Sequence, residues 1–356
     1  MLEELASTVQ IVPYDVHTRS KRIVQFMNAI SGRSYYLNLF VIPEMQSALD
    51  SICSRHQFDL VLFESVLVAG YQLPTGMKIV IDQHNIEHEL LERTFKQEKA
   101  FLRKWFSWRE SRLLKRGEIE RCRKAQVILV TSERERFALK HLIAQRQVEV
   151  VPNGVDIVTF NKHDTAQEID HRIVFTGRMD YYPNIDAVLF FARECWPHIR
   201  LQIPGASWLI VGKDPPGEVR DLAALPGVAV TGTVPDITSY LASAEVAIAP
   251  IQVGSGTRLK ILEALAMQKA VVTTSQGCEG LSVTSGVHLI VADQAREFAQ
   301  AVVDLMQDTQ KRKALGCAGR KLVETEYSWE RCGNQLLEVL EANFKEREEY
   351  ASTTGA

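Results

Sequence analysis

The sequence lacks the features that mark several large classes of protein. No run of 18 uninterrupted apolar residues occurs in the 356-residue chain, so a membrane-spanning helix is not expected. The six cysteines are scattered, without CxxC spacing or neighbouring histidines, which argues against a disulfide framework or a zinc site. A formal charge of −3 argues against a protein that binds nucleic acid over its whole surface.

The sequence also lacks internal repeats and low-complexity tracts, and its first residues lack the basic and apolar regions of a signal peptide. Apolar residues make up 46% of the chain and charged residues 24%, which is an ordinary globular composition. We therefore expect a folded cytoplasmic protein of two domains, given that domains commonly contain roughly 150 residues.

Short apolar runs alternate with segments of helical period along most of the chain. The expected strands are Val9–Val12, Leu60–Phe63, Lys78–Asp82, Val127–Thr131, Glu149–Val151, Ile173–Thr176, Trp208–Val211, Val228–Val230, Glu245–Pro250, Ala270–Thr274 and His288–Val291. The expected helices are Ala48–His56, a long segment from Glu87 to about Lys124, Asn184–Ile199, Glu218–Leu225, Ile237–Ala242, Arg258–Met267, Ala295–Gln307 and a stretch after about Ser328. This alternation predicts an α/β fold with two doubly wound, Rossmann-like domains built on parallel sheets.

A turn signal, Pro152-Asn153-Gly154, and the polar stretch after it place the predicted domain boundary. Residues 1–152 form the first predicted domain, and residues 153–170 form a linker. Residues 171–327 form the second domain, and residues 328–356 form a terminal helical segment.

Glycine follows five successive predicted strands of the second domain. The segments concerned are Gly177-Arg178, Gly212-Lys213, Thr231-Gly232-Thr233, Gly254–Arg258 and Ser275–Gly280. Ligands of open parallel sheets bind beyond the carboxyl ends of the strands, where glycine lets the backbone approach closely. The other interpretation is that these glycines only serve tight turns between strands and helices.

The segment Gly254–Arg258 runs directly into a predicted helix and carries the sharpest signal. Free N–H groups at a helix start attract anions, whereas cations such as Arg258 and Lys260 are unfavourable there unless an anion is bound. The absence of GxxxxGK[ST] excludes a P-loop. Glu263, between apolar neighbours, would suit the two vicinal hydroxyls of a ribose. The alternatives are that Arg258 and Lys260 form a solvated basic pair on a surface helix and that Glu263 lies on an exposed helix face.

His84 follows the predicted strand Lys78–Asp82 and is a candidate acid, base or hydrogen-bond donor. A structural turn histidine is the other interpretation. His88 lies four residues on, but no third ligand is evident, so no metal is expected.

The segment from Lys96 to Lys124 has 11 Lys or Arg against four Glu. Its aromatic residues Phe101, Trp105 and Trp108 recur at helical spacing. Such a helix can lie on an anionic membrane surface. Alternatively, the aromatic stripe packs on its own sheet and the charges face water. No nucleic-acid-binding motif is present, so no nucleic-acid partner is expected.

Three runs together resemble the group 1 (GT4-type) glycosyltransferases. They are Val151–Asp156 (VPNGVD), Phe175–Met179 (FTGRM) and Gly254–Ala266 (GSGTRLKILEALA). Asp82–Glu87 (DQHNIE) is similar to the segment of that family whose histidine lies near the reacting sugar. The resemblance implies a retaining enzyme of the two-Rossmann GT-B fold, with a terminal helix that crosses back to the first domain.

The resemblance also implies the site residues and the substrates. The implied donor-binding residues are Gly177, Arg178, Thr233, Val234, Gly254, Ser255, Gly256, Thr257, Arg258, Lys260 and Glu263, and the implied catalytic residues are His84, Arg178 and Lys260. The donor would be a nucleotide-diphosphate sugar and the acceptor a sugar or lipid-linked hydroxyl, without cofactor or metal. The implied setting is cell-surface polysaccharide or glycolipid synthesis at the inner face of the membrane.

The sequence departs from the family pattern at three places. Ser255 stands where the family commonly has a glutamate, and Pro183 or Asn184 stands where a lysine often follows the Gly-Arg pair, so Lys260 would supply that charge. The strand and glycine-rich loop that open the family do not precede Val9, so the first domain is expected to lack its first βα units. An inactive or truncated sugar-nucleotide-binding protein, or a sugar-nucleotide epimerase on the same fold, are therefore the alternatives.

Overall fold

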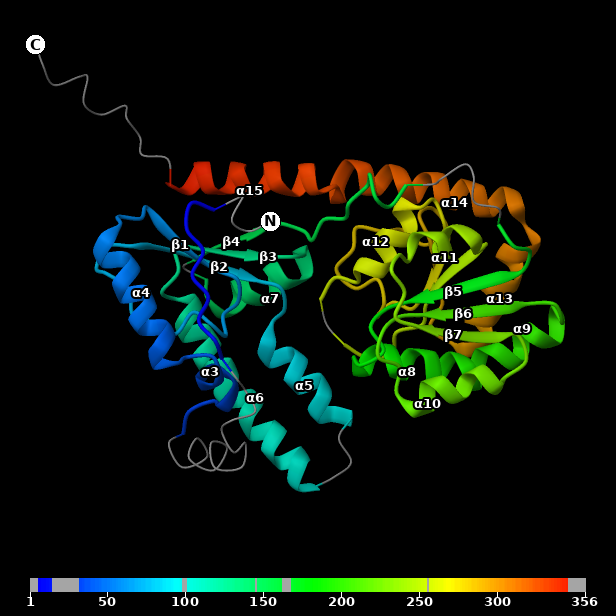
Figure 1. Ribbon diagram of the computed structural model, residues 1–356, viewed down its shortest axis with the longest axis horizontal. Coiled ribbons are helices and arrows are strands. Elements are labelled where there is room, and N and C mark those ends of the chain that lie inside the picture. The colour runs from blue at the N-terminus through cyan, green and yellow to red at the C-terminus, as the bar shows by residue number, and fades with distance from the viewer. Residues whose placement is uncertain are drawn as a thin grey trace, which may run out of the picture. The chain divides into compact units, whose positions relative to one another are not determined.

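The computed structural model describes residues 6–14, 32–97, 101–144, 146–161, 168–254 and 256–344. The chain divides into two compact units, Met1–Val150 and Val151–Ala356. Figure 1 shows a parallel sheet with surrounding helices in each unit. The expected α/β fold class is confirmed. The predicted linker and the crossing of the terminal helix remain predictions.

Unit 1 contains four parallel strands in the order β1-β2-β3-β4. The strands are β1 (Leu60–Phe63), β2 (Lys78–Gln83), β3 (Val127–Val130) and β4 (Gln147–Val150). The helices are α3 (Tyr35–Leu39), α4 (Pro43–Arg55), α5 (Glu87–Gln97), α6 (Phe101–Cys122) and α7 (Glu133–Leu142). All four residues of β3 are buried, because strands with helices on both faces have no solvent side.

The predicted strand Val9–Val12 is wrong. Residues 6–14 are described and form neither strand nor helix, and the side chain of Ile11 is 83% exposed. A strand is stable when it pairs with a neighbour and buries one face. This run does neither, and Pro13 at its end has no N–H to give to a sheet.

Unit 2 contains six parallel strands in the order β10-β9-β8-β5-β6-β7. They are β5 (Arg172–Thr176), β6 (Ser207–Val211), β7 (Val228–Gly232), β8 (Val246–Ala249), β9 (Ala270–Thr273) and β10 (Ile290–Val291). Counted within the unit, this is the Rossmann order 3-2-1-4-5-6. The order reverses between β5 and β8, and a doubly wound sheet binds ligands at such a switch point.

The helices of unit 2 follow the strands in chain order. They are α8 (Tyr182–Phe190), the π-helical turn η1 (Phe191–Cys195), α9 (Trp196–Gln202), α10 (Gly217–Arg220), the 3₁₀ turn η2 (Asp221–Ala224), α11 (Thr238–Ser243), α12 (Leu259–Ala266), α13 (Ala295–Gln307), α14 (Thr309–Leu322), the π-helical turn η3 (Val323–Tyr327) and α15 (Trp329–Phe344). The predictions did not include α14. Its first turn begins at Asp308, whose carboxylate accepts the N–H of Lys311.

The core of unit 2 contains a cluster of large aromatic rings. The rings of Phe191, Trp208 and Phe298 are fully buried, and Phe191 meets the other two edge to face at 4.7 and 5.9 Å. None of the helices in the described ranges is long and apolar enough to cross a membrane.

Candidate active site

A pocket of about 740 Å³ lies at the carboxyl edge of the unit 2 sheet, beside the switch point. It is lined by Thr176, Gly177, Arg178, Asp180, Tyr181, Asn184, Val211, Gly212, Lys213, Thr233, Val234, Ile237, Thr257, Arg258, Leu259, Lys260 and Glu263. The structure therefore brings eight of the sequence-predicted donor residues to one pocket: Gly177, Arg178, Thr233, Val234, Thr257, Arg258, Lys260 and Glu263. Gly254 and Gly256 lie in the same loop but outside the lining, and Ser255 lies outside the described residues.

Glycine is required where the ends of β5 and β6 meet. A Cβ atom on Gly212 would lie 1.7 Å from the carbonyl oxygen of Gly177. A Cβ atom on Gly177 would lie 2.7 Å from Nζ of Lys260. Because no side chain fits at either position, backbone alone forms this part of the pocket and a ligand can approach it closely.

The loop before α12 brings a guanidinium back over its own backbone. Gly254 has φ +121°, and a Cβ atom there would lie 2.5 Å from Nη2 of Arg258. Arg258 directly precedes α12 and is 9% exposed. A buried guanidinium at a helix start opposes the positive end of the helix dipole, and an anion bound in the pocket would remove that conflict.

Asn184 holds Lys260 in place, and sequence reasoning did not assign it to the site. Nζ of Lys260 donates to Oδ1 of Asn184 at 2.7 Å and lies 3.8 Å from the centroid of the Phe175 ring. Nδ2 of Asn184 donates to the carbonyl oxygen of Arg178 at 2.7 Å. One buried amide thus joins the β5 loop, α8 and α12. Its place after the Gly-Arg pair was the available sequence signal, but the contact depends on the tertiary fold.

The ammonium group of Lys260 sits in an unfavourable environment for its charge. Burial, followed by the nearby guanidinium of Arg258, lowers the pKa of Lys260 well below its usual value, and Glu263 partly offsets this. Burial raises the pKa of Glu263, while Lys260 lowers it. A bound polyanion would stabilise the charged form of Lys260.

Arg178 is placed differently from the other two cations. Its side chain is 67% exposed, and it donates to both carboxylate oxygens of Asp180 at 3.0 and 2.5 Å. This pairing lowers the pKa of Asp180. Arg178 reaches the pocket rim already engaged with a carboxylate, so an anionic ligand would compete with Asp180 for it.

Two family models match the chain, and between them they include both units. The model described as "Glycosyl transferases group 1" matches residues 170–308, which contain every residue lining the pocket. The model described as "Glycosyltransferase Family 4" matches residues 13–158. The chain belongs to the group 1 (GT4-type) glycosyltransferase family.

A curated relative of this chain is the GDP-mannose-dependent monoacylated alpha-(1-6)-phosphatidylinositol monomannoside mannosyltransferase of Corynebacterium glutamicum. The two are 29% identical over 114 residues, and the match spans 30% of either chain. Similar solved structures are a sucrose-phosphate synthase from Thermosynechococcus elongatus (TM-score 0.70, 18% identity, 87% of this chain and 79% of that one) and Anabaena HepE in complex with UDP (TM-score 0.66, 15% identity, 84% and 82%). At these identities the structures establish a shared fold.

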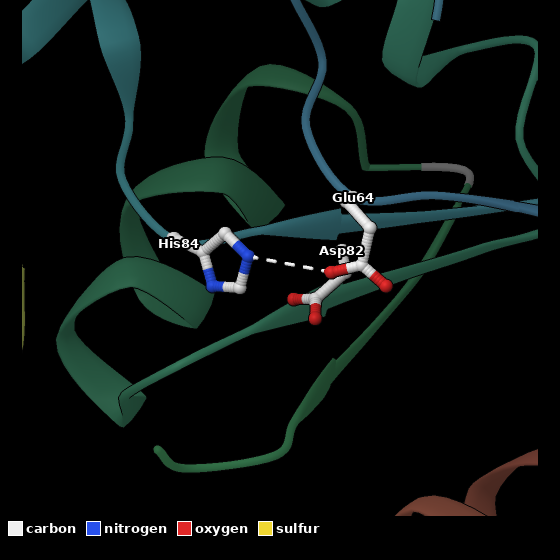
Figure 2. Close-up of side chains that lie close together, drawn as sticks. All are labelled: Glu64, Asp82 and His84. Atoms are coloured by element: carbon white, nitrogen blue, oxygen red, sulfur yellow. Dashed lines mark ion pairs between the residues drawn. The ribbon is translucent and has the colours of Figure 1, made fainter. Parts of the chain in front are cut away.

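In unit 1, His84 lies in a small cluster of titratable groups, which Figure 2 shows. Glu64 follows β1, while Asp82 and His84 lie at the end of β2. Nε2 of His84 is 3.7 Å from Oε2 of Glu64, and one side-chain ligand atom from each of the three residues falls within 4.8 Å of the others. Burial and Glu64 raise the pKa of Asp82, while His84 lowers it. Two carboxylates and an imidazole at this spacing can also hold a divalent cation, so the metal-free site remains a prediction.

A buried carboxylate fixes the turn that carries His84. Glu118 of α6 is fully buried and accepts a hydrogen bond from the side-chain amide of Gln83. It also accepts the backbone N–H of Glu87 at 3.1 Å and lies 2.6 Å from Nδ1 of His88. Glu118 therefore binds the chain on both sides of His84. It also accounts for His88 as a structural residue, an arrangement that sequence reasoning missed.

Proposed function

We propose that this protein transfers a sugar from a nucleotide-diphosphate sugar to an acceptor hydroxyl, with retention at the anomeric carbon. The observation that carries the proposal is the unit 2 pocket, where Arg258, Lys260 and bare backbone meet at the switch point of a Rossmann-type sheet. Such an edge is suited to a diphosphate, because cations and free N–H groups stabilise anionic oxygens.

In the proposed reaction the bond between the anomeric carbon and the diphosphate oxygen breaks. The nucleoside diphosphate leaves with the electron pair, while the acceptor oxygen bonds to the anomeric carbon and passes its proton to an oxygen of the leaving diphosphate. We assign Arg258, Lys260 and Arg178 to the charge that grows on the leaving diphosphate, which is usually a large electrostatic contribution to catalysis. His84 is assigned to the sugar undergoing transfer.

The remaining pocket residues fit the nucleoside part of such a donor. Glu263 is partly buried and could accept hydrogen bonds from two ribose hydroxyls. Thr233 and Val234, after β7, would line the base. The nucleotide-sugar class is supported by the curated relative, named as GDP-mannose-dependent, and by Anabaena HepE, solved with UDP-glucose.

We further propose a sugar or lipid-linked acceptor and a role in cell-surface polysaccharide or glycolipid synthesis, on the inner face of the membrane. The named acceptor of the Corynebacterium mannosyltransferase, a phosphatidylinositol monomannoside, supports this class. The donor side requires no cofactor, because the pocket's own cations can neutralise the diphosphate.

Calorimetric titration with UDP and GDP, followed by transfer assays with UDP- and GDP-sugars, tests the proposal. Replacing Arg258 with alanine is expected to weaken binding of the preferred nucleotide by roughly 1.5–3 kcal/mol, because a charge-assisted hydrogen bond is lost. Lys311→Ala on α14, an exposed cation outside the pocket, is the matched control and should bind as the unchanged protein does.

Three outcomes would contradict the proposal in different ways. Equal nucleotide affinity in the unchanged protein and in Arg258→Ala would remove the diphosphate site. Binding without any transfer would favour the non-catalytic alternative, to which Ser255 also points. Conversion of a nucleotide sugar into a different sugar nucleotide without acceptor would identify an epimerase.

A further inference from the structure

The helix α6 buries acidic side chains and exposes aromatic ones, the reverse of the usual arrangement. Glu110 is 1% exposed and Glu118 is fully buried. Glu110 accepts a hydrogen bond from Oγ of Ser34 at 2.5 Å and another from the N–H of Tyr36 at 3.4 Å. The inward face of α6 therefore includes two carboxylates whose hydrogen-bond donors lie on other segments.

The outward face of α6 carries two tryptophans. Trp105 is 54% exposed and Trp108 is 40% exposed. The guanidinium carbon of Arg112 lies 4.5 Å from the centroid of the Trp108 ring. The spacing of three and four residues keeps these three side chains on one face of the helix. The sequence left open whether the aromatic stripe packs on its own sheet; for Trp105 and Trp108 it does not.

The same face continues as a basic groove. A hollow of about 480 Å³ is lined by Arg112, Lys115, Arg116, Ile119, Glu120 and Arg123. The carboxylate of Glu120 lies 4.0 Å from Nζ of Lys124, so its charge is shared with a fifth cation. The groove is thus strongly positive in a protein whose formal net charge is −3.

We propose that this face, defined by Trp105, Trp108, Arg112, Lys115, Arg116 and Arg123 and here called the α6 face, docks on the surface of an anionic lipid bilayer. Tryptophan is favoured at the boundary between headgroups and acyl chains, and juxtaposed cations are attracted to anionic lipids. Duplex nucleic acid, whose bases are already stacked, or an acidic protein would use the cations but would gain less from two large rings at one end of the patch. The proposal rests on the α6 face alone and does not depend on the donor site.

Sedimentation of the full chain with vesicles tests the proposal. Binding is expected with vesicles containing phosphatidylglycerol and not with pure phosphatidylcholine, and raised salt should release most of the protein. In Arg112→Gln/Arg116→Gln the partition coefficient should fall roughly 25-fold, since each cation near an anionic surface contributes about fivefold. Lys311→Gln/Lys313→Gln on α14 removes the same charge elsewhere and is the matched control.

A second pair of variants tests the aromatic part of the α6 face. Trp105→Ser/Trp108→Ser should abolish the binding that remains at high salt. Phe137→Ser, which removes a 68% exposed ring from α7, should leave that binding unchanged.

Any of three results would overturn the proposal. The first is that the protein does not bind anionic vesicles at low salt. The second is that the α6 variant with two arginines replaced and the α14 variant with two lysines replaced lose the same amount of binding. The third is that the variant with both tryptophans replaced binds as well at high salt as Phe137→Ser does. Tight, salt-sensitive binding of single-stranded RNA without vesicle binding would assign the α6 face to a different polyanion.

Discussion

The carboxyl edges of the two sheets carry opposite charges. Beyond β1 and β2 of unit 1, the side chains that gather are Glu64, Asp82 and His84. Beyond the strands of unit 2, the pocket gathers four cations, Arg178, Lys213, Arg258 and Lys260, against two carboxylates, Asp180 and Glu263. Both edges belong to parallel sheets, so the difference lies in the residues that follow the strands and not in the fold.

This difference teaches which ligand each edge can hold. The unit 2 edge contains two buried cations, Arg258 and Lys260, whose burial is unfavourable until an anion binds. The unit 1 edge contains carboxylates, which repel a diphosphate but accept hydrogen bonds from sugar hydroxyls. Function is carried by such local chemistry, because the same sheet architecture serves many unrelated reactions.

The largest effect expected from the contrast between the two sheet edges is at Lys260. Lys260→Met should weaken nucleotide binding roughly 10- to 100-fold, because a buried charge-assisted contact to the diphosphate is lost. Calorimetry with UDP and GDP measures it. Lys213→Met is the control at the same edge. Its side chain is 49% exposed and 3.7 Å from Asp214, so only a few-fold loss is expected. An equal effect of both substitutions would contradict the assignment.

The partly buried carboxyl of Glu87, near the carboxyl end of β2 in unit 1, should make the protein less stable as the pH rises. Burial and Glu118 raise the pKa of Glu87 to about 7. Its value in the unfolded chain is about 4.3, so the folded state binds more protons between these values and the free energy of unfolding falls as pH rises. Glu87→Gln should therefore raise that free energy by roughly 1–3 kcal/mol at pH 8 and leave it unchanged at pH 4. Urea unfolding at pH 4 and pH 8 measures this free energy. The same difference between the unchanged protein and Glu87→Gln at both pH values would refute the prediction.

The lowered pKa of Lys260 predicts a pH dependence of donor binding. Below that pKa the free protein is already charged, whereas above it binding requires uptake of a proton, so affinity falls as pH rises. We expect the affinity to fall as the pH is raised through that pKa, with a limiting slope of about tenfold per pH unit, which corresponds to the uptake of one proton. Titrations between pH 6 and 9 measure this slope. Calorimetry with a nucleotide-diphosphate sugar suits the test, because its phosphates do not titrate there. In Lys260→Arg the side chain stays charged, so the donor affinity should not change with pH. An affinity that still falls as pH rises would mean that another group titrates.

The smallest effect expected is at Asp180. Asp180→Asn releases Arg178 from its exposed ion pair, so nucleotide affinity should rise about two- to fivefold. Glu133→Gln, which breaks an exposed ion pair with Arg136 on α7, is the control and should have no effect on binding. Weaker binding by Asp180→Asn would mean that the carboxylate positions Arg178 for the ligand.

Much of the fold could be read from the sequence, because apolar runs set the strands. Leu60–Phe63 and Ala295–Gln307 match the observed bounds of β1 and α13. Val9–Val12 has the same pattern but no partner strand among the described residues, and periodicity alone cannot reveal that. The residues expected to bind the donor could be located because they follow strands in a sheet whose edge collects ligands.

The residues whose roles could not be predicted from the sequence are polar side chains that lie in the interior. Glu110 and Glu118 lie in a helix rich in charge, where a glutamate is normally expected to face water. The side chain of Asn184 accepts a hydrogen bond from Lys260, which lies 76 residues away in the chain, on α12. Contacts of this kind exist only after folding, so no spacing rule predicts them.

The close approach of Gly212 to the carbonyl of Gly177 limits how this protein can be redesigned. A Cβ atom at either position would require its neighbours to shift, and for Gly212 the neighbour is backbone, so this part of the pocket floor leaves little room for substitution. Libraries that aim to change the preferred nucleotide should leave both glycines alone and vary Thr233, Val234 and Ile237, where side chains already line the pocket.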